Sequence, residues 1–426
     1  MLVDSLLKLC SKKAAKYLLE DRYKHLDFTL QPPLSDQVFR EVSLKDKNYS
    51  DIITQETGVK LNLTKFTHFP YKVTLKAIES LHLHDLESLV LGRSGFSDLL
   101  EYIIITEERS YVDIVRLLKT CLTENSRKNL KHLELGFCNF YPDGWIESIG
   151  ELVPNLLSFK CDVFPKKVDK AFPNLVHLSF RDDSAISENF DEIGRLKNLQ
   201  TLCIPWRLFS SPEQLKGILE LPNLRVLDIS SATGFYENLL LCDGKFQNLK
   251  HLDCYGSVDL TETVLRTIVE RNPSLEEIIA HDTDSEFVDF SDLGIKVSNL
   301  ATVSSTMDSL DYIMHYNYRY LWWEETTKDC FERLKERLEN GMAGLFDEDV
   351  FLELMMKAFH RGTEEVTQCL IAFFKHLFPG KSIKEVLRHL DAQPKTPVLA
   401  KQRWAAQIVS YYYEDMGKKR RLKDPF

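Results

Sequence analysis

One histidine pair and one acidic stretch are the features of this sequence that could suggest a metal site. His82 and His84 are two residues apart, so on a strand their side chains would share one face and could reach the same ion. A zinc site needs at least three protein ligands, and the sequence suggests no third one nearby. The acidic stretch HDTDSEFVDFSD at 281–292 lacks the glycine and the terminal glutamate of a calcium loop. We therefore expect two surface histidines, a solvated acidic loop, and no metal or other cofactor.

Motifs for catalysis are absent from the sequence as well. It contains no phosphate-binding glycine loop, no G-x-S-x-G elbow, no H-E-x-x-H helix and no cysteines paired at metal spacing. The run GRSG at 92–95 has the wrong spacing for a nucleophile elbow. Nine cysteines without CxxC pairs, and no secretory signal, favour reduced thiols. We expect a non-catalytic protein located in the cytoplasm, the nucleus or both.

A different kind of chemistry, docking to another protein, is suggested by the run SLLKLCSKKA at 5–14. It predicts a helix over Ser5–Leu19, capped by Asp4, with an apolar stripe that includes Leu6, Cys10 and Ala14. The small residues in this stripe would let a partner helix approach closely. The opposite side of the helix is expected to carry Lys8, Ser11, Lys12 and Lys16.

A second short helix is predicted after the break at Pro32 and Pro33. Its apolar positions, at helical steps, are Leu34, Val38, Phe39 and Val42.

The elements that must position these helices come from a repeat. Segments of the type NLKHLEL begin at residues 129, 155, 174, 198, 223 and 248, and a weaker copy begins at 274. The spacing of 19 to 26 residues and the alternating leucines are typical of leucine-rich repeats. Each copy predicts a short strand followed by a helix, as at 145–152, 212–219 and 261–269. An earlier strand is expected near 85–91, with one long or two degenerate repeats before 129, and an N-terminal copy near 60–63.

The residues between the buried leucines of each strand are expected to face outward and to form a surface for a partner protein. Candidate substrate-binding residues on this surface are His132, Glu134, Lys160, His177, Asp228, His251 and Asp253.

From residue 307 onward the sequence predicts helices, at 329–340, 348–360, 364–377, 382–391 and 399–414. We therefore expect an α/β fold: a leucine-rich-repeat solenoid with an N-terminal helical box and a C-terminal all-α, armadillo-like unit. The expected domains are the box at 1–58, the repeats at 59–298 and the helical unit at 299–426.

The N-terminal residues resemble a known docking motif. Ser5-Leu6-x-x-x-Cys10-x-x-x-Ala14 resembles the elongin-binding BC box, and the helix after Pro33 resembles a degenerate cullin-2 box; together these make a VHL box. This order of parts resembles the Zyg and Zer family of leucine-rich-repeat substrate receptors of cullin-2 ubiquitin ligases. The family's longer armadillo unit, which reads glycine-type N-terminal degrons, exceeds the length of residues 299–426, so its degron pocket is not carried over.

The resemblance implies an adaptor subunit of an E3 ubiquitin ligase that sends a protein target to proteasomal degradation. Leu6 would insert into a hydrophobic pocket of elongin C, itself bound to elongin B, beside Ser5, Cys10 and Ala14. The residues that would contact cullin-2 are Pro33, Leu34, Val38, Phe39 and Val42.

The net charge of −10 disfavours nucleic-acid binding and suits a basic protein target. No run of apolar residues is long enough for a membrane span, so no membrane partner is expected. A CCCH zinc-finger protein is one option for the target, because a related nematode receptor of this ligase class recognises such proteins. The alternative is a leucine-rich-repeat interaction scaffold without linkage to a ligase, in which the first helix only caps the repeats.

Overall fold

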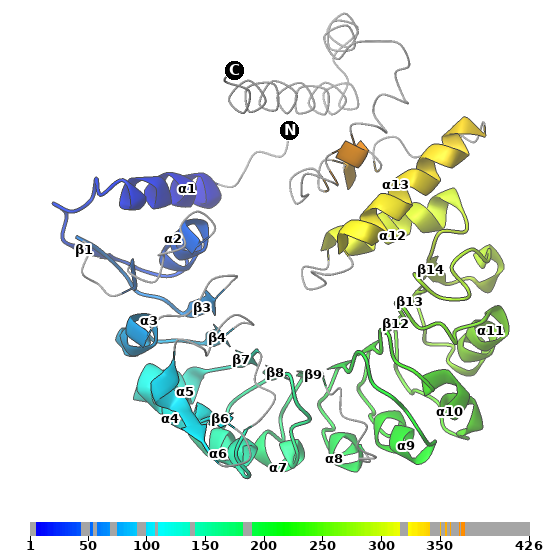
Figure 1. The fold of residues 1–426 in the computed structure, drawn as a ribbon, viewed down its shortest axis with the longest axis horizontal. Coiled ribbons are helices and arrows are strands. Elements are labelled where there is room, and N and C mark those ends of the chain that lie inside the picture. Colours follow the sequence, from blue (N-terminus) through cyan, green and yellow to red (C-terminus); the bar gives the residue numbers. More distant parts are fainter. Residues whose placement is uncertain are drawn as a thin grey trace, which may run out of the picture. The chain divides into compact units, whose positions relative to one another are not determined.

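The computed structural model describes residues 6–43, 52–53, 58–68, 75–91, 99–106, 110–136, 141–181, 190–315 and 323–340, and further along 350, 354–355, 358, 366 and 368–370. These residues form a mixed α/β structure with a large parallel sheet, as the sequence predicts (Figure 1). The chain packs into two compact units. The first contains residues 2–253 and 268–275, and the second contains residues 254–267 and those from 276 onward. The domain boundaries expected at 58/59 and 298/299 remain predictions.

The first unit begins with two helices and two short strands. These are α1 (Leu6–Leu19), β1 (Phe28–Leu30), α2 (Leu34–Ser43) and β2 (Val59–Leu61). Helix α1 packs on α2, and β1 pairs with β2 in parallel. Both helices lie where the sequence predicts them, while the proposed cap Asp4 lies outside the described residues.

The large sheet of this unit follows the order β12-β11-β10-β9-β8-β7-β4-β3, with every adjacent pair parallel. Its strands are β3 (Lys65–His68), β4 (Ser88–Leu91), β7 (His132–Leu135), β8 (Ser158–Cys161), β9 (His177–Phe180), β10 (Thr201–Cys203), β11 (Val226–Asp228) and β12 (His251–Asp253). The N-terminal copy expected near 60–63 corresponds to β3, which begins three residues after Asn62, just as β7 begins three residues after Asn129. Strand β2 pairs with β1 instead and lies outside this sheet.

Strand β4 pairs directly with β7, so the stretch between them is one long repeat. It holds η4 (Leu100–Tyr102), the antiparallel hairpin of β5 (Ile103–Ile105) and β6 (Ser110–Val112), and the helices α4 (Ile114–Cys121) and α5 (Glu124–Asn129). Helix α3 (Leu75–Ser80) and the turn η2 (Leu81–Leu83) precede β4.

Each later strand is followed by a helix, and Figure 1 shows the first five of these helices along one side of the sheet. The helices are α6 (Trp145–Leu152), α7 (Val168–Ala171), α8 (Asp191–Gly194), α9 (Glu213–Leu219), α10 (Phe235–Leu241) and α11 (Glu262–Arg271). The predicted helices at 145–152, 212–219 and 261–269 agree with α6, α9 and α11 to within two residues at each end.

The asparagine that opens the repeated segment links neighbouring repeats at three positions. The Nδ2 atoms of Asn155, Asn223 and Asn248 donate to backbone carbonyls about one repeat earlier, at 2.9, 2.8 and 2.7 Å. The leucine after each asparagine is buried, and so is the central leucine or phenylalanine of the strand that follows it. The sequence pattern thus supplies both the core of the sheet and the hydrogen bonds that hold adjacent turns together.

A row of aromatic rings continues this core between the strands and the helices. Phe180, Phe190, Phe209 and Phe235 follow one another with ring centroids 5.2 to 6.0 Å apart, in tilted or edge-on contacts. Such contacts stabilise a core by about 0.5–1.5 kcal/mol each beyond simple burial.

The second unit contains β13 (Glu277–Ile279) paired in parallel with β14 (Lys296–Ser298), the turn η5 (Ser291–Leu293), and the helices α12 (Val303–His315) and α13 (Trp323–Glu339). Helix α13 contains most of the helix predicted at 329–340. The helices predicted at 382–391 and 399–414, and most of those at 348–360 and 364–377, lie outside the described residues.

Candidate interaction surfaces

Helix α1 turns one side toward α2 and leaves apolar side chains on another. Ser11, Ala15 and Leu18 recur at steps of four and three residues and are buried. Leu9 is 47% exposed and Cys10 is exposed. Ser11 was expected on the polar side, so that prediction is wrong: the small residues that fit against α2 are Ser11 and Ala15.

The predicted elongin-binding residues therefore lie beside the buried stripe rather than within it. Cys10 is exposed and Ala14 is half-buried. The backbone of Leu6 begins α1, one turn before Cys10, while its side chain and Ser5 lie outside the described residues. The helix thus presents exposed apolar side chains at Leu9 and Cys10 although it is anchored to the chain's own core.

Helix α2 joins α1 to the sheet. The ring of Phe39 stacks on Phe66 of β3 with centroids 5.4 Å apart. The carboxylate of Asp36 accepts hydrogen bonds from the backbone N–H groups of Thr64 and Lys65 at 2.9 and 3.1 Å, and from the Thr64 hydroxyl at 2.6 Å. These contacts fix α2, and through it α1, against the first strand of the sheet.

Most of the predicted cullin-binding residues belong to this anchor. Val38, Phe39 and Val42 are each at most 2% exposed, so they pack inside the chain. Pro33 is exposed and Leu34 is half-buried. Of the predicted set, these two residues offer surface to a partner.

The strand register places the predicted substrate-binding residues in two straight rows across the sheet. The first row runs His132, Ser158, His177, Thr201, Val226 and His251. The second row, two residues further along each strand, runs Glu134, Lys160, Ser179, Cys203, Asp228 and Asp253. The row between them is the buried one, so both rows lie on the face of the sheet away from the leucine core.

These rows are less exposed than expected at two positions. Glu134 and Asp253 are 6% and 5% exposed, whereas His177 is exposed and Asp228 and His251 are half-buried. The carboxylate of Glu134 forms an ion pair with the Nζ atom of Lys160 at 2.7 Å. This pair cancels one positive and one negative charge of the second row, whose remaining formal charges are the aspartates.

Burial favours the neutral form of two histidines in the first row, His132 and His177. Burial lowers the pKa of His132, and its Nδ1 atom lies 2.7 Å from the Ser158 hydroxyl. Burial also lowers the pKa of His177. At these two positions the first row therefore offers hydrogen-bonding groups more readily than positive charge.

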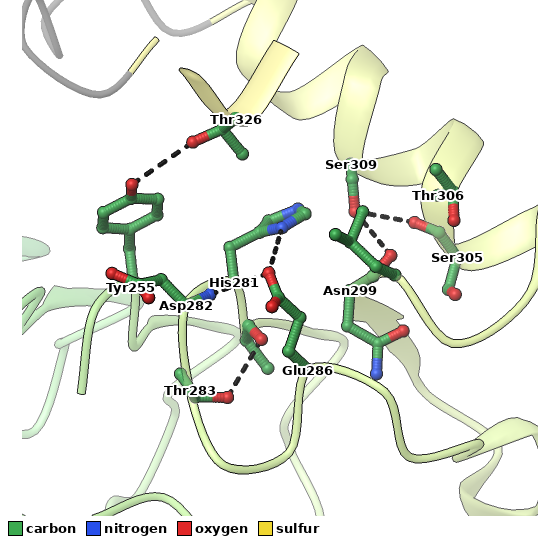
Figure 2. Close-up of polar contacts among 12 residues, drawn as sticks. Tyr255, His281, Asp282, Thr283, Glu286, Asn299, Ser305, Thr306, Ser309 and Thr326 are labelled. Carbon is green, nitrogen blue, oxygen red and sulfur yellow. Dashed lines mark hydrogen bonds and ion pairs between the residues drawn. The ribbon is translucent and has the colours of Figure 1, made fainter. Parts of the chain in front are cut away.

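In the second unit, the acidic stretch after β13 is a loop anchored by two buried residues, His281 and Ser285 (Figure 2). His281 is 1% exposed, with its Nδ1 atom 3.5 Å from Oε1 of Glu286. That same Oε1 atom accepts a hydrogen bond from the backbone N–H of Asp282 at 3.0 Å. Ser285 is fully buried and donates to the carbonyl of Leu260 at 2.6 Å. The expectation of a solvated loop is therefore wrong for His281 and Ser285, while the four aspartates of the stretch are exposed as expected: Asp282, Asp284, Asp289 and Asp292.

Burial of the Glu286 carboxyl acts to raise its pKa, but the His281 ring and the Asp282 N–H outweigh this effect, so the pKa of Glu286 lies below its usual range. Above the loop, the Thr326 hydroxyl of α13 donates to the Tyr255 hydroxyl at 3.2 Å (Figure 2). The contacts of Glu286 hold the loop in place, and the hydrogen bond between Thr326 and Tyr255 holds α13, both inside the second unit.

One of the two histidines considered for metal binding, His84, has a structural role instead. His82 is exposed, in the turn η2, but His84 is 1% exposed and follows that turn rather than lying on a strand. Its Nδ1 atom accepts from the backbone N–H of Leu63 at 3.4 Å, and its Nε2 atom lies 3.2 Å from the carbonyl of Ile53. The expectation of a surface position is wrong for His84. Within the described residues, no group of three or more potential ligands could hold a metal ion.

The sequence analysis did not identify Trp206, an exposed aromatic residue. Trp206 follows β10 with a left-handed φ of 66° and is 39% exposed, and the guanidinium of Arg181 lies over its ring at 5.3 Å. An alignment of the repeats on one another would have found it, because the equivalent positions hold Ser231, Gly256 and Asp282.

Comparison with known proteins gives a distant relationship. No protein-family profile matches the chain. Gastrulation-defective protein 3 of Caenorhabditis elegans is 24% identical over 325 residues, which cover 74% of this chain and 45% of that protein. The chain thus spans less than half the length of this distant homologue, whose name states no molecular activity. Among the helices that the structure describes, none is long and apolar enough to cross a membrane.

Proposed function

We propose that this chain is the substrate-recognition subunit of a cullin-RING E3 ubiquitin ligase, joined to cullin-2 through elongin B and elongin C. The observation that carries the proposal is the pair of exposed apolar residues, Leu9 and Cys10, on the free side of α1. Water-exposed leucines next to a predicted BC box support helix-in-groove docking, in which a partner removes them from solvent. In this proposal Leu6 enters the elongin C pocket, and Ser5, Cys10 and Ala14 lie beside it.

The anchoring of α1 supports a receptor role over that of a loosely attached tail. Because α1 packs on α2, and α2 is bonded to β3 through Asp36 and Phe39, an elongin C molecule on α1 would be held in a fixed orientation to the sheet. A receptor without catalytic residues acts by raising the effective concentration of target lysines near the conjugating enzyme. Rigid attachment makes that effective concentration well defined.

In the same proposal cullin-2 contacts Pro33 and Leu34, since these are the predicted residues with free surface. The strand–helix units are leucine-rich repeats that capture a protein target, and residues 299–426 form an armadillo-like unit. The ligase would operate in the cytoplasm or the nucleus, without a cofactor, nucleic acid or membrane as partner.

Co-purification with elongin B and elongin C tests the proposal. We expect the intact chain to form a stable complex, and Leu6→Ser with Cys10→Ser to abolish it without lowering the unfolding temperature. Leu18→Ser, on the buried side of α1, is the matched control, and it should destabilise the fold by about 2–4 kcal/mol. If the intact chain forms no complex, or if the double variant unfolds as easily as Leu18→Ser, the docking role fails.

The alternative, an interaction scaffold without linkage to a ligase, is favoured by one observation. Ser11, Ala15 and Leu18 make α1 a cap on the first elements of the unit, which a repeat array needs in any case. This alternative predicts no elongin complex and a loss of stability for changes on either side of α1.

A further inference from the structure

The hairpin of β5 and β6 belongs to an insertion in the repeat array. Strands β4 and β7 begin 44 residues apart, whereas successive strands from β7 to β12 begin 19 to 26 residues apart. Because β4 nevertheless pairs directly with β7, the sheet is continuous without the extra residues. Insertions in repeat arrays form loops that often lie on the binding face, so this hairpin is a candidate interaction site.

The hairpin and the turn before it expose apolar side chains. Part of the insertion is packed into the chain, since Tyr102 and Val112 are 2% and 6% exposed. By contrast, Leu100, Ile104 and Ile105 are 72%, 45% and 82% exposed. Successive residues of a strand point to opposite faces, so Ile104 and Ile105 place apolar surface on both faces of the hairpin.

One edge of β5 has no strand paired with it in the described part of the chain. On its other edge β5 pairs with β6, and the backbone N–H of Asp113 donates to the carbonyl of Tyr102 at 2.7 Å. Hydrogen-bonded and non-hydrogen-bonded positions alternate along an antiparallel pair, so Ile104 bonds to β6, while the N–H and C=O groups of Ile103 and Ile105 point to the opposite edge. Among the residues that the structure describes, these backbone groups have no hydrogen-bond partner.

The free edge also lacks the features that usually block pairing with another chain. Edge strands are commonly protected by lysine, proline or a bulge. Ile103–Ile105 contains neither a charge nor a proline, and its register with Ser110–Val112 is continuous, without a bulge. An unprotected edge of β-branched residues is a template for an extended segment.

The occupant favoured by these features is a segment of another protein rather than a second copy of this chain. The net charge of −10 makes two copies repel each other. A stable interface buries about 800 Å² and about 20–30 residues on each side, far more than this short strand supplies. A single extended segment needs less surface, because main-chain hydrogen bonds provide much of its affinity.

The charges around β5 define the segment further. No charged residue lies between Tyr102 and Thr106, so a charge opposite the isoleucines would lose its hydration without gaining an ionic partner. Arg116 lies at the start of β5, where its Nη1 atom donates to the carbonyl of Glu101 at 3.0 Å. Since Arg116 and Glu101 have opposite charges, they give no net preference for an acidic or a basic segment.

We infer that β5 binds an extended, uncharged segment of a partner protein, which joins the hairpin as a third strand. The backbone of this segment pairs with Ile103 and Ile105, and its apolar side chains cover Ile104 and Ile105. β-Branched and aromatic residues suit these positions best. The inference goes beyond the proposed function, since this surface contains no residue of α1 or α2.

Phage display of random decapeptides tests the inference. Phage are selected on the intact chain after depletion on Ile105→Lys, in which a charge blocks the edge. We expect the selected peptides to be rich in β-branched and aromatic residues and to lack proline. The strongest of them, labelled and titrated by fluorescence anisotropy, should bind Ile105→Lys and Ile104→Lys at least about tenfold more weakly, which corresponds to about 1.4 kcal/mol.

Methylation of single peptide nitrogens distinguishes strand pairing from contact between apolar side chains alone. An N-methyl group removes a backbone donor, so it should weaken binding about tenfold at the alternate positions that face β5 and have little effect at the positions between them. This measurement uses the intact chain, so it does not depend on the stability of any variant.

Two controls separate recognition from folding. Leu241→Lys introduces the same charge at a side chain that is 72% exposed on α10, and it should leave the affinity unchanged. Ile105→Lys alters a side chain that is 82% exposed, so its unfolding temperature should match that of the intact chain. Its co-purification with elongin B and elongin C should be unchanged too, so failure of the ligase role would appear separately.

The inference is wrong if no peptide is selected, if Leu241→Lys weakens binding equally, or if the effects of N-methylation do not alternate. A dimer of the intact chain in sedimentation equilibrium that Ile104→Lys dissociates would also overturn it, because a second copy would then occupy the edge.

Discussion

The buried imidazole of His84 makes the stability of the first unit depend on pH. In the neutral ring, Nδ1 accepts from the Leu63 N–H and Nε2 donates to the Ile53 carbonyl, so both nitrogens are used without a charge. Burial lowers the pKa of His84, and the charge of His82 lowers it further, against opposing effects of the Ile53 carbonyl and of Asp36 and Asp85. Protonation would place a second N–H opposite the N–H of Leu63.

The sign of the effect follows from linkage. The pKa of His84 is depressed in the folded chain, so the stabilisation is fully present above the unfolded pKa near 6.5 and is lost as the pH falls through the folded pKa. Over that interval, one proton taken up on unfolding changes the free energy of unfolding by up to about 1.4 kcal/mol per pH unit.

Urea unfolding of the intact chain and of His84→Gln between pH 7.5 and 5 measures this contribution. Glutamine keeps one donor and one acceptor but does not titrate, so the stability difference between the two proteins should shrink as the pH falls. Taking the difference removes the contributions of His132 and His177, whose pKa values are also lowered. A difference that stays constant from pH 7.5 to 5 would refute the assignment of a neutral, doubly bonded ring.

Four further substitutions test the fold. Phe209→Ala, in the middle of the row of rings, should cost about 3–5 kcal/mol in urea unfolding. Gly217→Ala should cost about 1–3 kcal/mol, because the new Cβ would lie 2.0 Å from the carbonyl oxygen of Phe190. Gly144→Ala meets no atom within 4 Å, so only its φ of 77° opposes the change, and thermal unfolding should show a loss of about 1 kcal/mol. Asp36→Asn should cost about 1–3 kcal/mol by weakening the charged hydrogen bonds that hold α2, and proteolysis should then release the segment before β3 more readily.

The repeat was predictable because its residues act locally. In three repeats the asparagine side-chain amide reaches a carbonyl about one repeat earlier, and the central apolar residue of each strand is buried. A strict sequence period therefore maps directly onto a parallel register. The same reasoning fails where burial depends on distant residues. His84 looks like a surface residue beside His82 until Leu63 and Ile53, more than twenty positions away, close around it.

The N-terminal helix shows a subtler limit of sequence patterns. Leu9, Cys10 and Ala14 on one side and Ala15 and Leu18 on the other are all apolar enough to be buried, so a helical wheel alone does not decide which side faces the chain itself. The structure resolves this through α2, which covers Ser11, Ala15 and Leu18. What remains exposed is a stripe centred one residue earlier in the sequence.

This arrangement changes how the two roles of α1 relate to each other. A cap and a docking helix compete for the same surface only if they use the same side, and here the side that caps is separated from the side that would dock by about one 100° step of the helix. Changes at Leu18 and changes at Cys10 should therefore have separable effects, one on stability and the other on association. If the two always changed together in measured variants, the helix would have a single face and the cap alone would account for it.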